Sequence, residues 1–520
     1  MVTVETIKSR RIAGNTVALF LRQIAVLAIN LYMIRVLLQT LGVEDYAVYA
    51  VVYNLIMMTS FLWGSIQTIT QRFFAYAIGA GDTEKAKACY DANIILCFGV
   101  ALLAWAALET IGVWFITEKM NVAADRLDAA LFMFRAYFVF ALLKIFSTFF
   151  ASVIMAHEDM RTFALISILE AFLRVCAAVS LTMLPFDPLI TFAVLFSVIE
   201  VFIASIFALL VITRYRECSL RLPRLDVGML REMLRFSGWT VFGQITTISR
   251  NQAITILINQ AFSPATVAAR VLAFSVGSQV LAFSTNFSMA LNPPITKSWA
   301  SGAHDEMYRL IFLGSKIAFY LVWVATLPIL ATLPGILTLW LGEYPAETVM
   351  FTRLALIENA IVALAFPLMA AVRATGDMRA YELILGSMQI MVLLASWVLI
   401  IAGFAAVSVY VIAIVVNILM FGTRLALASA KTGLPAIEFL REVIGPVGLV
   451  TLLSSLWIFG VLWIVPEAEY LEFSLPSFCA VVAIFVAPAI IALRVGLDAA
   501  QRAILVGLIS KKLGARGAEQ

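Results

Sequence analysis

Long apolar runs recur along the whole chain and constrain its fold more than any other feature. A membrane-spanning helix needs about 20 predominantly apolar residues, and hydrophobic residue types make up 63% of the 520 residues. Reading the chain between polar breaks predicts helices at 12–38, 45–71, 90–116, 129–154, 162–184, 189–212, 236–261, 266–292, 309–332, 349–372, 380–402, 405–428, 443–465 and 476–494. The chain is therefore predicted to be an all-α polytopic membrane protein with about 14 transmembrane helices, or thirteen if the two runs around Gly403 form one helix. This excludes a soluble enzyme, a disordered chain, a coiled coil and an outer-membrane barrel, whose strands alternate polar and apolar residues over short segments.

Few residues are suited to metal or cofactor chemistry. The chain has only two histidines, His157 and His304, which excludes a multi-histidine metal site. No GxxxxGK(S/T) motif occurs, so the chain lacks the phosphate cradle of an ATP-driven pump. The five cysteines form no CxxC pair and lie mostly in apolar runs, as small buried side chains do. We expect no cofactor, no metal and no nucleic-acid partner.

Lysine and arginine are concentrated in one of the two sets of alternate loops. This set includes the loops around 8–11, 85–87, 214–235 and 511–516, whereas the opposite loops are acidic or neutral, as at Glu343 and Glu347. Cytoplasmic loops of membrane proteins carry such an excess. The pattern predicts that both termini lie in the cytoplasm and that the polar N-terminal segment leads directly into an anchoring helix.

Two short segments recur at nearly the same spacing and indicate an internal repeat. Asp159-Met160-Arg161 matches Asp377-Met378-Arg379 at an offset of 218 residues, and Gly81 aligns with Gly302 at an offset of 221. Six helices return the chain to its starting side, so the two copies should be related by a pseudo-twofold axis along the membrane normal. The predicted organisation is an N-terminal six-helix lobe at 1–213, a basic cytoplasmic linker at 214–235, a C-terminal six-helix lobe at 236–430, and two additional helices with a tail at 431–520.

Polar stripes at helical spacing mark the first two helices of each predicted lobe. Such a stripe either joins neighbouring helices by hydrogen bonds or faces a water-filled cavity. Because the stripes fall on equivalent helices of the two lobes, we expect a hydrated cavity between the lobes. The amide side chains expected to line it are Gln23, Asn30, Gln67, Gln244, Asn251, Gln279 and Asn286.

Ionisable residues also occur inside the predicted helices. Arg22 and Arg250 lie near the middle of their helices, where an arginine is costly in hydrocarbon. Because guanidinium groups bind phosphate in a bidentate manner, we predict that both arginines bind an anion; pairing with a carboxylate on another helix is the alternative. Lys144, Glu200 and Glu358 are candidates for ion coupling, or for salt bridges within the bundle.

Two further features have simple structural interpretations. Arg270 lies near a helix end, from which its long side chain can reach the membrane surface. Pro293-Pro294 is expected to end the helix that begins near 266, because proline lacks a backbone N–H and clashes with the preceding turn. A hinge at the two prolines is the alternative.

The opening of the chain resembles the start of polysaccharide flippases. In that family a helix ends in an R-x-LG-x-x-x-Y-G-x-Y signature before the second span. The matching residues are Arg35, Leu41, Gly42, Tyr46 and Tyr49, and Ala47 replaces the usual second glycine. The family is the Wzx-type (O-unit) branch of the multidrug/oligosaccharidyl-lipid/polysaccharide exporter superfamily, and the helix count and the repeat extend the resemblance over the whole chain.

The resemblance implies a flippase without enzymatic activity. Its substrate would be a polyprenyl-diphosphate-linked oligosaccharide, such as an O-antigen or other surface-polysaccharide repeat unit, moved across the bacterial cytoplasmic (inner) membrane by alternating access. Its partners would be the lipid bilayer, the lipid-linked glycan, and the glycosyltransferases and polysaccharide polymerase of the same pathway. The role of Arg22 and Arg250 is inferred from their charge and position, and is not carried over from the motif.

Three other functions stay open. A cation-coupled small-molecule exporter of the same superfamily would use Glu200 or Glu358 as its coupling carboxylate. A peptidoglycan-precursor flippase would carry a related lipid diphosphate. A membrane glycosyltransferase could use Glu44-Asp45, but such enzymes generally need large outer loops, and the longest one predicted here covers only roughly 117–128.

Overall fold

The computed structural model is helical, with no strand among the residues that it describes. These are residues 59–118, 127–219, 223–341, 344–464, 475–498 and 501–502, with scattered positions between 15 and 57. Three residues of the flippase-like signature, Arg35, Gly42 and Tyr46, lie outside the described residues, as does Glu44. The chain divides into an N-terminal unit, Val17–Val241, and a C-terminal unit that begins at Phe242.

The N-terminal unit is built around one central helix. Its helices are α2 (Ser60–Gly79), α3 (Thr83–Ala107), the π-helical turn η1 (Leu108–Gly112), α4 (Val113–Glu118), α5 (Leu127–Ala156), α6 (Met160–Ser180), α7 (Pro188–Arg214) and the first part of α8 (Val227–Ala261). Helix α5 packs against α2, α3, α6 and α7. Its contact with α7 is aromatic: the rings of Tyr137 and Phe196 stack with centroids 4.8 Å apart.

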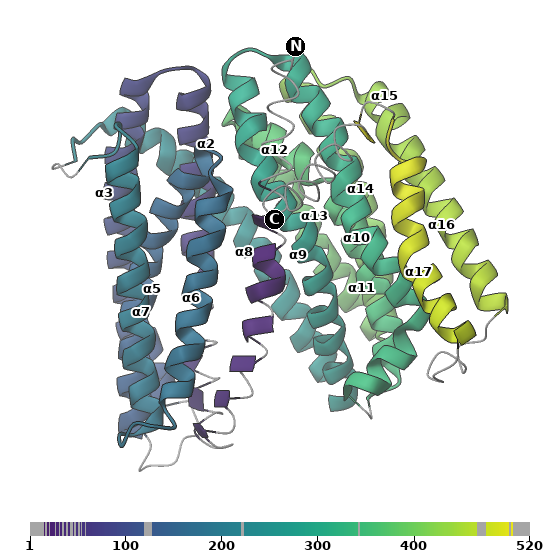
Figure 1. Cartoon of the computed structure of the whole chain (residues 1–520), viewed down its shortest axis with the longest axis horizontal. Coiled ribbons are helices and arrows are strands. Elements are labelled where there is room, and N and C mark those ends of the chain that lie inside the picture. Colours follow the sequence, from purple (N-terminus) through teal and green to yellow (C-terminus); the bar gives the residue numbers. More distant parts are fainter. Residues whose placement is uncertain are drawn as a thin grey trace, which may run out of the picture. The chain divides into compact units, whose positions relative to one another are not determined.

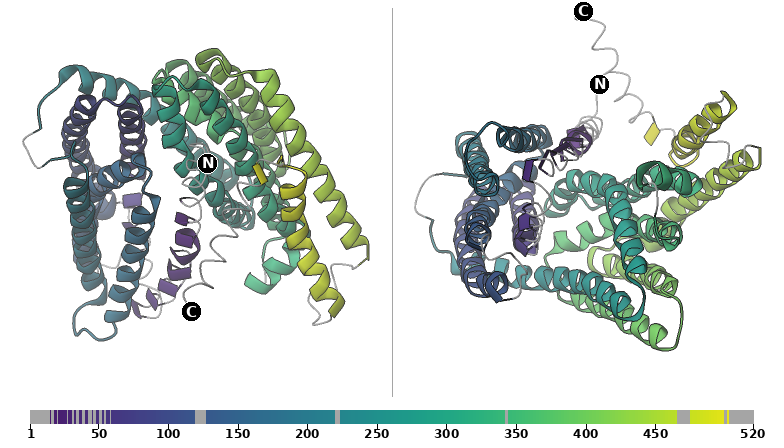
Figure 2. Two further views of the ribbon diagram at one scale, coloured as in Figure 1. Left: turned by 45° about the horizontal axis from the view of Figure 1, so that its top comes forward. Right: turned by 90° about the horizontal axis from the view of Figure 1, so that it is seen from below.

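The C-terminal unit holds the remaining helices, which run alongside one another (Figures 1 and 2). They are the rest of α8, then α9 (Pro264–Ala300), α10 (His304–Leu341), α11 (Glu347–Leu364), α12 (Phe366–Thr375), α13 (Arg379–Ile401), α14 (Val407–Thr432), α15 (Ala436–Phe439), the π-helical turn η3 (Leu440–Ile444), α16 (Gly445–Ile464) and α17 (Leu475–Arg494). Helix α9 packs against α10, α11 and α12, and α11 also packs against α14. Helices α16 and α17 pack against each other and against α10.

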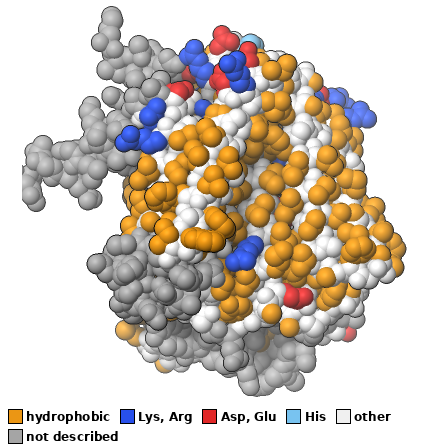
Figure 3. Space-filling model, turned by 90° about the vertical axis from the view of Figure 1, so that its right-hand side faces the viewer, with side chains coloured by type: hydrophobic (Ala, Val, Ile, Leu, Met, Phe, Trp, Pro, Cys, Tyr) orange, Lys and Arg blue, Asp and Glu red, His pale blue; other side chains and the backbone are white. Residues whose placement is uncertain are grey.

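The apolar runs predicted from 90 onward correspond to these helices, whereas most of the predicted helix 12–38 and the first part of 45–71 include residues outside the described ones. Ten helices of the described part are long and apolar enough to cross a membrane. Figure 3 shows one face of the C-terminal unit on which apolar side chains cover most of the described surface, with charged side chains gathered mainly along the upper edge. Helices α13 and α14 are separate, because the chain turns between them at Gly403, whose φ is 86°. The alternative of one continuous helix at 380–428 is therefore wrong.

Two predicted helix boundaries also need correction. Helix α8 begins at Val227, so the last part of the predicted linker is helical. Helix α9 continues to Ala300 with Pro293 and Pro294 inside it, so the two prolines do not end the helix. The turns on both sides are held by burial: Ala290, Leu291 and Ile295 are at most 3% exposed. Packing of this kind outweighs the two hydrogen bonds that proline removes.

The turns at the two sequence matches have the same backbone geometry in both units. Gly81 and Gly302 have φ values of 69° and 73°, a region that is costly for residues with a Cβ. Each donates its N–H to the carbonyl three residues earlier, over 3.1 Å in both cases. Glu158 and Gly376, 218 residues apart, also share a positive φ, of 64° and 82°. The repeat inferred from the sequence is therefore a repeat of local structure.

An ion pair recurs beside the second of these turns. In the N-terminal unit, Arg214 Nη1 at the end of α7 donates to Asp159 Oδ2 over 2.6 Å. In the C-terminal unit, Lys431 near the end of α14 makes the corresponding bond to Asp377. Each pair joins the start of one helix to the end of the next, which fixes the register of α6 against α7 and of α13 against α14.

Candidate functional site

Charged side chains inside the N-terminal unit form one ion-pair cluster between α5, α6 and α7. Lys144 Nζ donates to Glu170 Oε1 over 2.9 Å and to Glu200 Oε2 over 3.4 Å. Arg174 bonds Glu170 one helical turn away and reaches Glu200 Oε2 over 3.5 Å. Glu200 is fully buried and its second oxygen accepts a 2.6 Å bond from Ser147 Oγ. Lys144 and Glu200 were predicted either to couple ions or to form salt bridges within the bundle. In the structure they form salt bridges within the bundle.

The cluster is balanced in charge. Two cations face two carboxylates, and each carboxylate contacts both cations. A buried charge is strongly unfavourable unless it is paired, and here each of the four charged groups has a partner of opposite sign. The cluster therefore joins three helices, and Arg22 adds a further positive charge within electrostatic reach of Glu170.

The predicted site residues near the beginning of the chain lie in the same unit. Arg22 is partly buried, 5.3 Å from the ring of Phe163 and within electrostatic reach of Glu170. Gln23 is partly buried and Asn30 is exposed. Gln67 Nε2 lies 3.9 Å from Met155 Sδ. These contacts do not gather the four residues into one described cavity.

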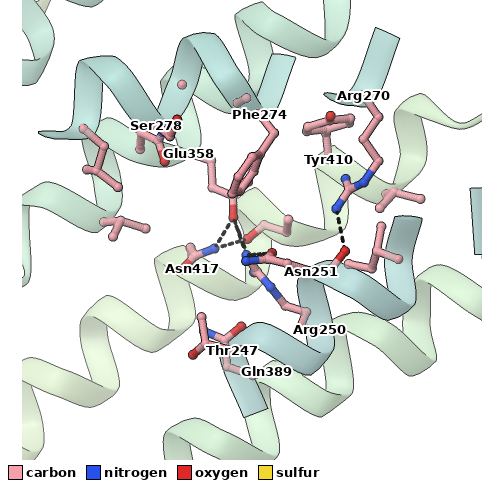
Figure 4. Close-up of a pocket in the computed structure, with 18 of the residues that line it drawn as sticks. Thr247, Arg250, Asn251, Arg270, Phe274, Ser278, Glu358, Gln389, Tyr410 and Asn417 are labelled. Atoms are coloured by element: carbon pink, nitrogen blue, oxygen red, sulfur yellow. Dashed lines mark hydrogen bonds and ion pairs between the residues drawn. The ribbon is translucent and has the colours of Figure 1, made fainter. Parts of the chain in front are cut away.

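The C-terminal unit contains a cavity of about 330 Å³ between α8, α9, α11, α13 and α14. Its volume falls at the lower end of the range for small-molecule sites, ~300–1,000 Å³. Figure 4 shows polar side chains from these helices pointing toward one another across it. The polar and charged lining residues are Thr247, Arg250, Asn251, Arg270, Ser278, Glu358, Asn359, Gln389, Tyr410, Asn417 and Arg424.

Arg250 and Glu358 form the centre of this pocket. Arg250 Nη1 and Nη2 lie 3.4 and 3.3 Å from the same carboxylate oxygen, Glu358 Oε1. Asn417 Nδ2 donates to that oxygen over 2.9 Å, and Arg250 Nη2 also donates to Asn251 Oδ1 over 3.2 Å. The alternative prediction for Arg250, pairing with a carboxylate on another helix, therefore describes the structure.

Arg270 faces the same pocket, which the sequence analysis did not predict. It is 8% exposed; its Nε donates to Thr255 Oγ1 over 3.0 Å and its Nη2 to the carbonyl of Asn251 over 3.3 Å. Its guanidinium carbon lies 5.8 Å from the ring centroid of Tyr410. The polar stripe of α8 offers these acceptors beside α9, so the side chain turns inward, and the prediction that it reaches the membrane surface is wrong.

The pocket carries an excess of positive charge. Its ionisable lining residues at neutral pH are Arg250, Arg270 and Arg424 against Glu358, which gives a formal balance of +2. Outside the lining, the Glu382 carboxylate interacts electrostatically with both Arg424 and Arg373, and adding Glu382 and Arg373 leaves the formal balance unchanged. The surroundings are apolar helices, so this charge is poorly screened.

Only some of the site residues predicted for this unit line the pocket. Arg250, Asn251 and Glu358 line it. Gln244, Gln279 and Asn286 do not: Gln244 is partly buried, Gln279 is exposed and Asn286 is buried elsewhere on α9.

Asn417 was missed, although the repeat could have revealed it. It is the only amide in the apolar run of α14, and it lies 217 residues after Glu200. The same offset separates Arg214 from Lys431, the two cations of the recurring ion pair. Asn417 thus holds in α14 the position that the buried Glu200 holds in α7.

Comparison with known proteins supports the fold and leaves the function open. No protein-family model matches the sequence, and no curated protein matches it. Solved structures do match. An outward-facing multidrug resistance MATE family transporter of the MOP superfamily is 13% identical, with a TM-score of 0.72 over 82% of this chain and 96% of its own. The chain has the MATE fold.

Two more matches have the same character. A MATE structure in the bent conformation is 15% identical, with a TM-score of 0.72 over 83% of this chain and 99% of its own. A MOP superfamily transporter from Pyrococcus furiosus is 14% identical, with a TM-score of 0.69 over 83% and 98%, and is described as having a binding pocket of reverse polarity that suggests a different function. The expected superfamily fold and the multi-pass membrane architecture are thus supported, whereas none of these three is described as a polysaccharide flippase.

Proposed function

We propose that this protein is a membrane transporter that moves an anionic substrate, and that the pocket of the C-terminal unit recognises the negatively charged group. The observation that carries the proposal is the balance of three arginines to one carboxylate in that pocket. An arginine at the centre of a membrane costs ~2.5–3.5 kcal/mol or more unless it has a polar or charged partner. Excess positive charge is therefore favoured there when a ligand supplies the missing negative charge.

The substrate class that we propose is a polyprenyl-diphosphate-linked oligosaccharide, carried across the bacterial cytoplasmic membrane by alternating access. Guanidinium groups suit phosphate oxygens, and an isolated charge cannot enter hydrocarbon without a cost of tens of kcal/mol by Born estimates. A pocket of about 330 Å³ suits the phosphate-bearing part of such a lipid, and the glycan and the lipid tail would lie outside it. A peptidoglycan-precursor lipid offers the same diphosphate chemistry and is included in the proposal.

A cation-coupled small-molecule exporter is the second candidate. The MATE transporters that share the fold favour it, as does Glu358, a carboxylate inside the pocket. A pocket for a cationic drug, however, should be acidic or aromatic, and this one carries a formal balance of +2. The two candidates therefore differ in the sign of the charge that the substrate must carry.

Transport by the purified full-length protein in liposomes tests the two candidates against each other. The first probe is a polyprenyl-diphosphate-linked sugar with a fluorophore on the sugar, which dithionite bleaches only in the outer leaflet. The protein should expose the inner-leaflet fraction to bleaching, and Arg250→Gln and Arg270→Gln should slow this. Arg441→Gln, at an exposed arginine of η3 outside the pocket, is the matched control.

The second probe is ethidium, a cationic drug, driven by an imposed proton or sodium gradient. Movement of ethidium without movement of the labelled lipid would reject the flippase in favour of the exporter. Movement of the lipid at the same rate in wild type and both pocket variants would reject the role of the pocket.

A further inference from the structure

We propose that Glu358 is a built-in competitor for the substrate anion: a phosphate or diphosphate group binds Arg250 by displacing the Glu358 carboxylate, which takes up a proton as it is released. The inference rests on the proposed function and deepens it. No covalent bond to the substrate forms or breaks. The proton comes from the acid form of the buffer in bulk solvent and ends on a Glu358 carboxylate oxygen.

The Arg250–Glu358 contact is poorly made for a permanent ion pair. Strong arginine–carboxylate pairs use two nitrogens and two oxygens in parallel, at ~2.7–2.9 Å. Here both terminal nitrogens share Glu358 Oε1 at 3.4 and 3.3 Å. The Lys144–Glu170 pair in the N-terminal unit, at 2.9 Å, is shorter. The pocket pair is thus the more easily exchanged of the two.

Arg250 also has a donor that the protein leaves unused. Its Nε is buried and has no hydrogen-bond partner in the described structure. A buried unsatisfied donor costs ~1–3 kcal/mol, and more for a charged group. A phosphate group that bonds Nε and Nη2 in parallel would satisfy this donor, and it would give Arg250 the fork geometry that Glu358 does not supply.

Such a phosphate cannot simply be added beside the carboxylate. Its oxygens would lie near Glu358 Oε1, which already contacts both terminal nitrogens of Arg250. Like charges this close in a low-dielectric site repel strongly, and in our proposal a proton taken up by the carboxyl group relieves this repulsion. Binding of the anion and protonation of Glu358 are therefore coupled.

Asn417 can keep its hydrogen bond to the carboxyl group of Glu358 in either protonation state. Its Nδ2 donates to Glu358 Oε1 over 2.9 Å and to the carbonyl of Ala413 over the same distance. The carbonyl oxygen of a protonated carboxyl group still accepts the first of these bonds. Protonation therefore releases Arg250 without leaving the Asn417 amide unpaired.

The other groups facing Glu358 would also hold the anion. Arg250 comes from α8, Arg270 from α9, and Tyr410 and Arg424 from α14, whereas α13 contributes the neutral Gln389. Helices α10 and α12, which also pack against α11, supply no lining residue. Among the described lining residues Glu358 is the only carboxylate, so it is the carboxylate that exchanges with the anion.

Calorimetric titration of inorganic pyrophosphate into the purified full-length protein in detergent tests the inference. Glu358→Gln, which keeps the size and the acceptor of the side chain, should bind pyrophosphate on the order of tenfold tighter than wild type. Wild type should bind pyrophosphate more tightly as the pH falls, and Glu358→Gln should not show this increase in affinity. Pyrophosphate itself gains protons in this range, so the pH effect is read as the difference between the two proteins. Glu347→Gln, on the same helix three turns away and outside the pocket, should bind like wild type.

The outcomes separate the inference from the function on which it rests. Pyrophosphate binding by wild type with equal or weaker binding by Glu358→Gln would overturn the competitor role and leave the anion pocket standing. Failure of both proteins to bind would overturn the anion pocket itself. If Glu358→Gln does not fold, wild type titrated with sulfate in buffers of different ionisation enthalpy decides. Sulfate gains no proton in this range, so binding without net proton uptake would refute the inference.

Discussion

The ion-pair cluster of the N-terminal unit gives the sharpest stability prediction. Glu200→Gln removes the negative charge of a fully buried side chain and can keep the bond from Ser147. The cluster then holds two cations and one carboxylate. Breaking a buried pair costs ~3–5 kcal/mol, and we expect about 3 kcal/mol, at the lower end of that range, because Lys144 and Arg174 both keep Glu170 as a partner.

Thermal unfolding measures this loss. A domain of 150–250 residues loses roughly 2–4 °C of melting temperature per kcal/mol, and the unit Val17–Val241 is of this size. The melting temperature should therefore fall by about 6–12 °C. The measurement is tryptophan fluorescence of the purified protein in detergent, recorded as the temperature rises. Glu84→Gln breaks an exposed pair with Lys87 and, as the control, should cost at most ~1 kcal/mol.

A double variant shows whether charge imbalance is the cause. Lys144→Met combined with Glu200→Gln leaves Glu170 and Arg174 as a neutral pair. Most of the lost stability should return, because replacing a buried charge by an apolar side chain of similar volume is often neutral or stabilising. If the single variant melts like wild type, or the double variant melts no higher than the single one, the reasoning about the cluster is wrong.

The remaining stability predictions concern glycines and use the same melting assay. Gly81→Ala and Gly302→Ala should cost similar amounts, ~1–2 kcal/mol each, because both turns need a positive φ. Gly99→Ala should gain up to about 1 kcal/mol from better helix propensity, because nothing lies within 4 Å of the added Cβ. If Gly99→Ala costs as much as the two turn variants, the positive φ is not the cause of their loss of stability. Gly243→Ala should cost ~1–3 kcal/mol, because its Cβ would clash with the carboxylate of Glu382, and a neutral effect would show that this carboxylate moves freely.

The fold could be predicted from the sequence because its determinants are local. Apolar runs of membrane length define each helix within its own segment. The repeat was visible because a turn with positive φ keeps its glycine, as at Gly81 and Gly302, and because Asp159 and Asp377 each bond a cation at the end of the following helix. The prediction that Pro293-Pro294 ends its helix was wrong, because burial of the turns on both sides outweighs the local effect of proline.

The pocket could be predicted only in part because it depends on contacts between distant segments. Arg250 and Glu358 are 108 residues apart, and nothing in either helix indicates which carboxylate meets which arginine. Arg270 faces inward because α8 presents Thr255 and the carbonyl of Asn251 to it. A stripe read on one helix identifies a polar face, but the partner of that face is set by packing.

The two units carry different residues at one position of the repeat, and the difference bears on the anion site that we propose in the C-terminal unit. In α7 the position is occupied by Glu200, whose charge is matched within the protein by Lys144 and Arg174. In α14 it is occupied by Asn417, which can hold Glu358 but adds no negative charge. One carboxylate therefore faces three arginines among the described lining residues of the C-terminal pocket, whereas in the N-terminal cluster two carboxylates face Lys144 and Arg174. The acid in α7 and the amide in α14 thus contribute to the difference in charge between the N-terminal cluster and the C-terminal pocket.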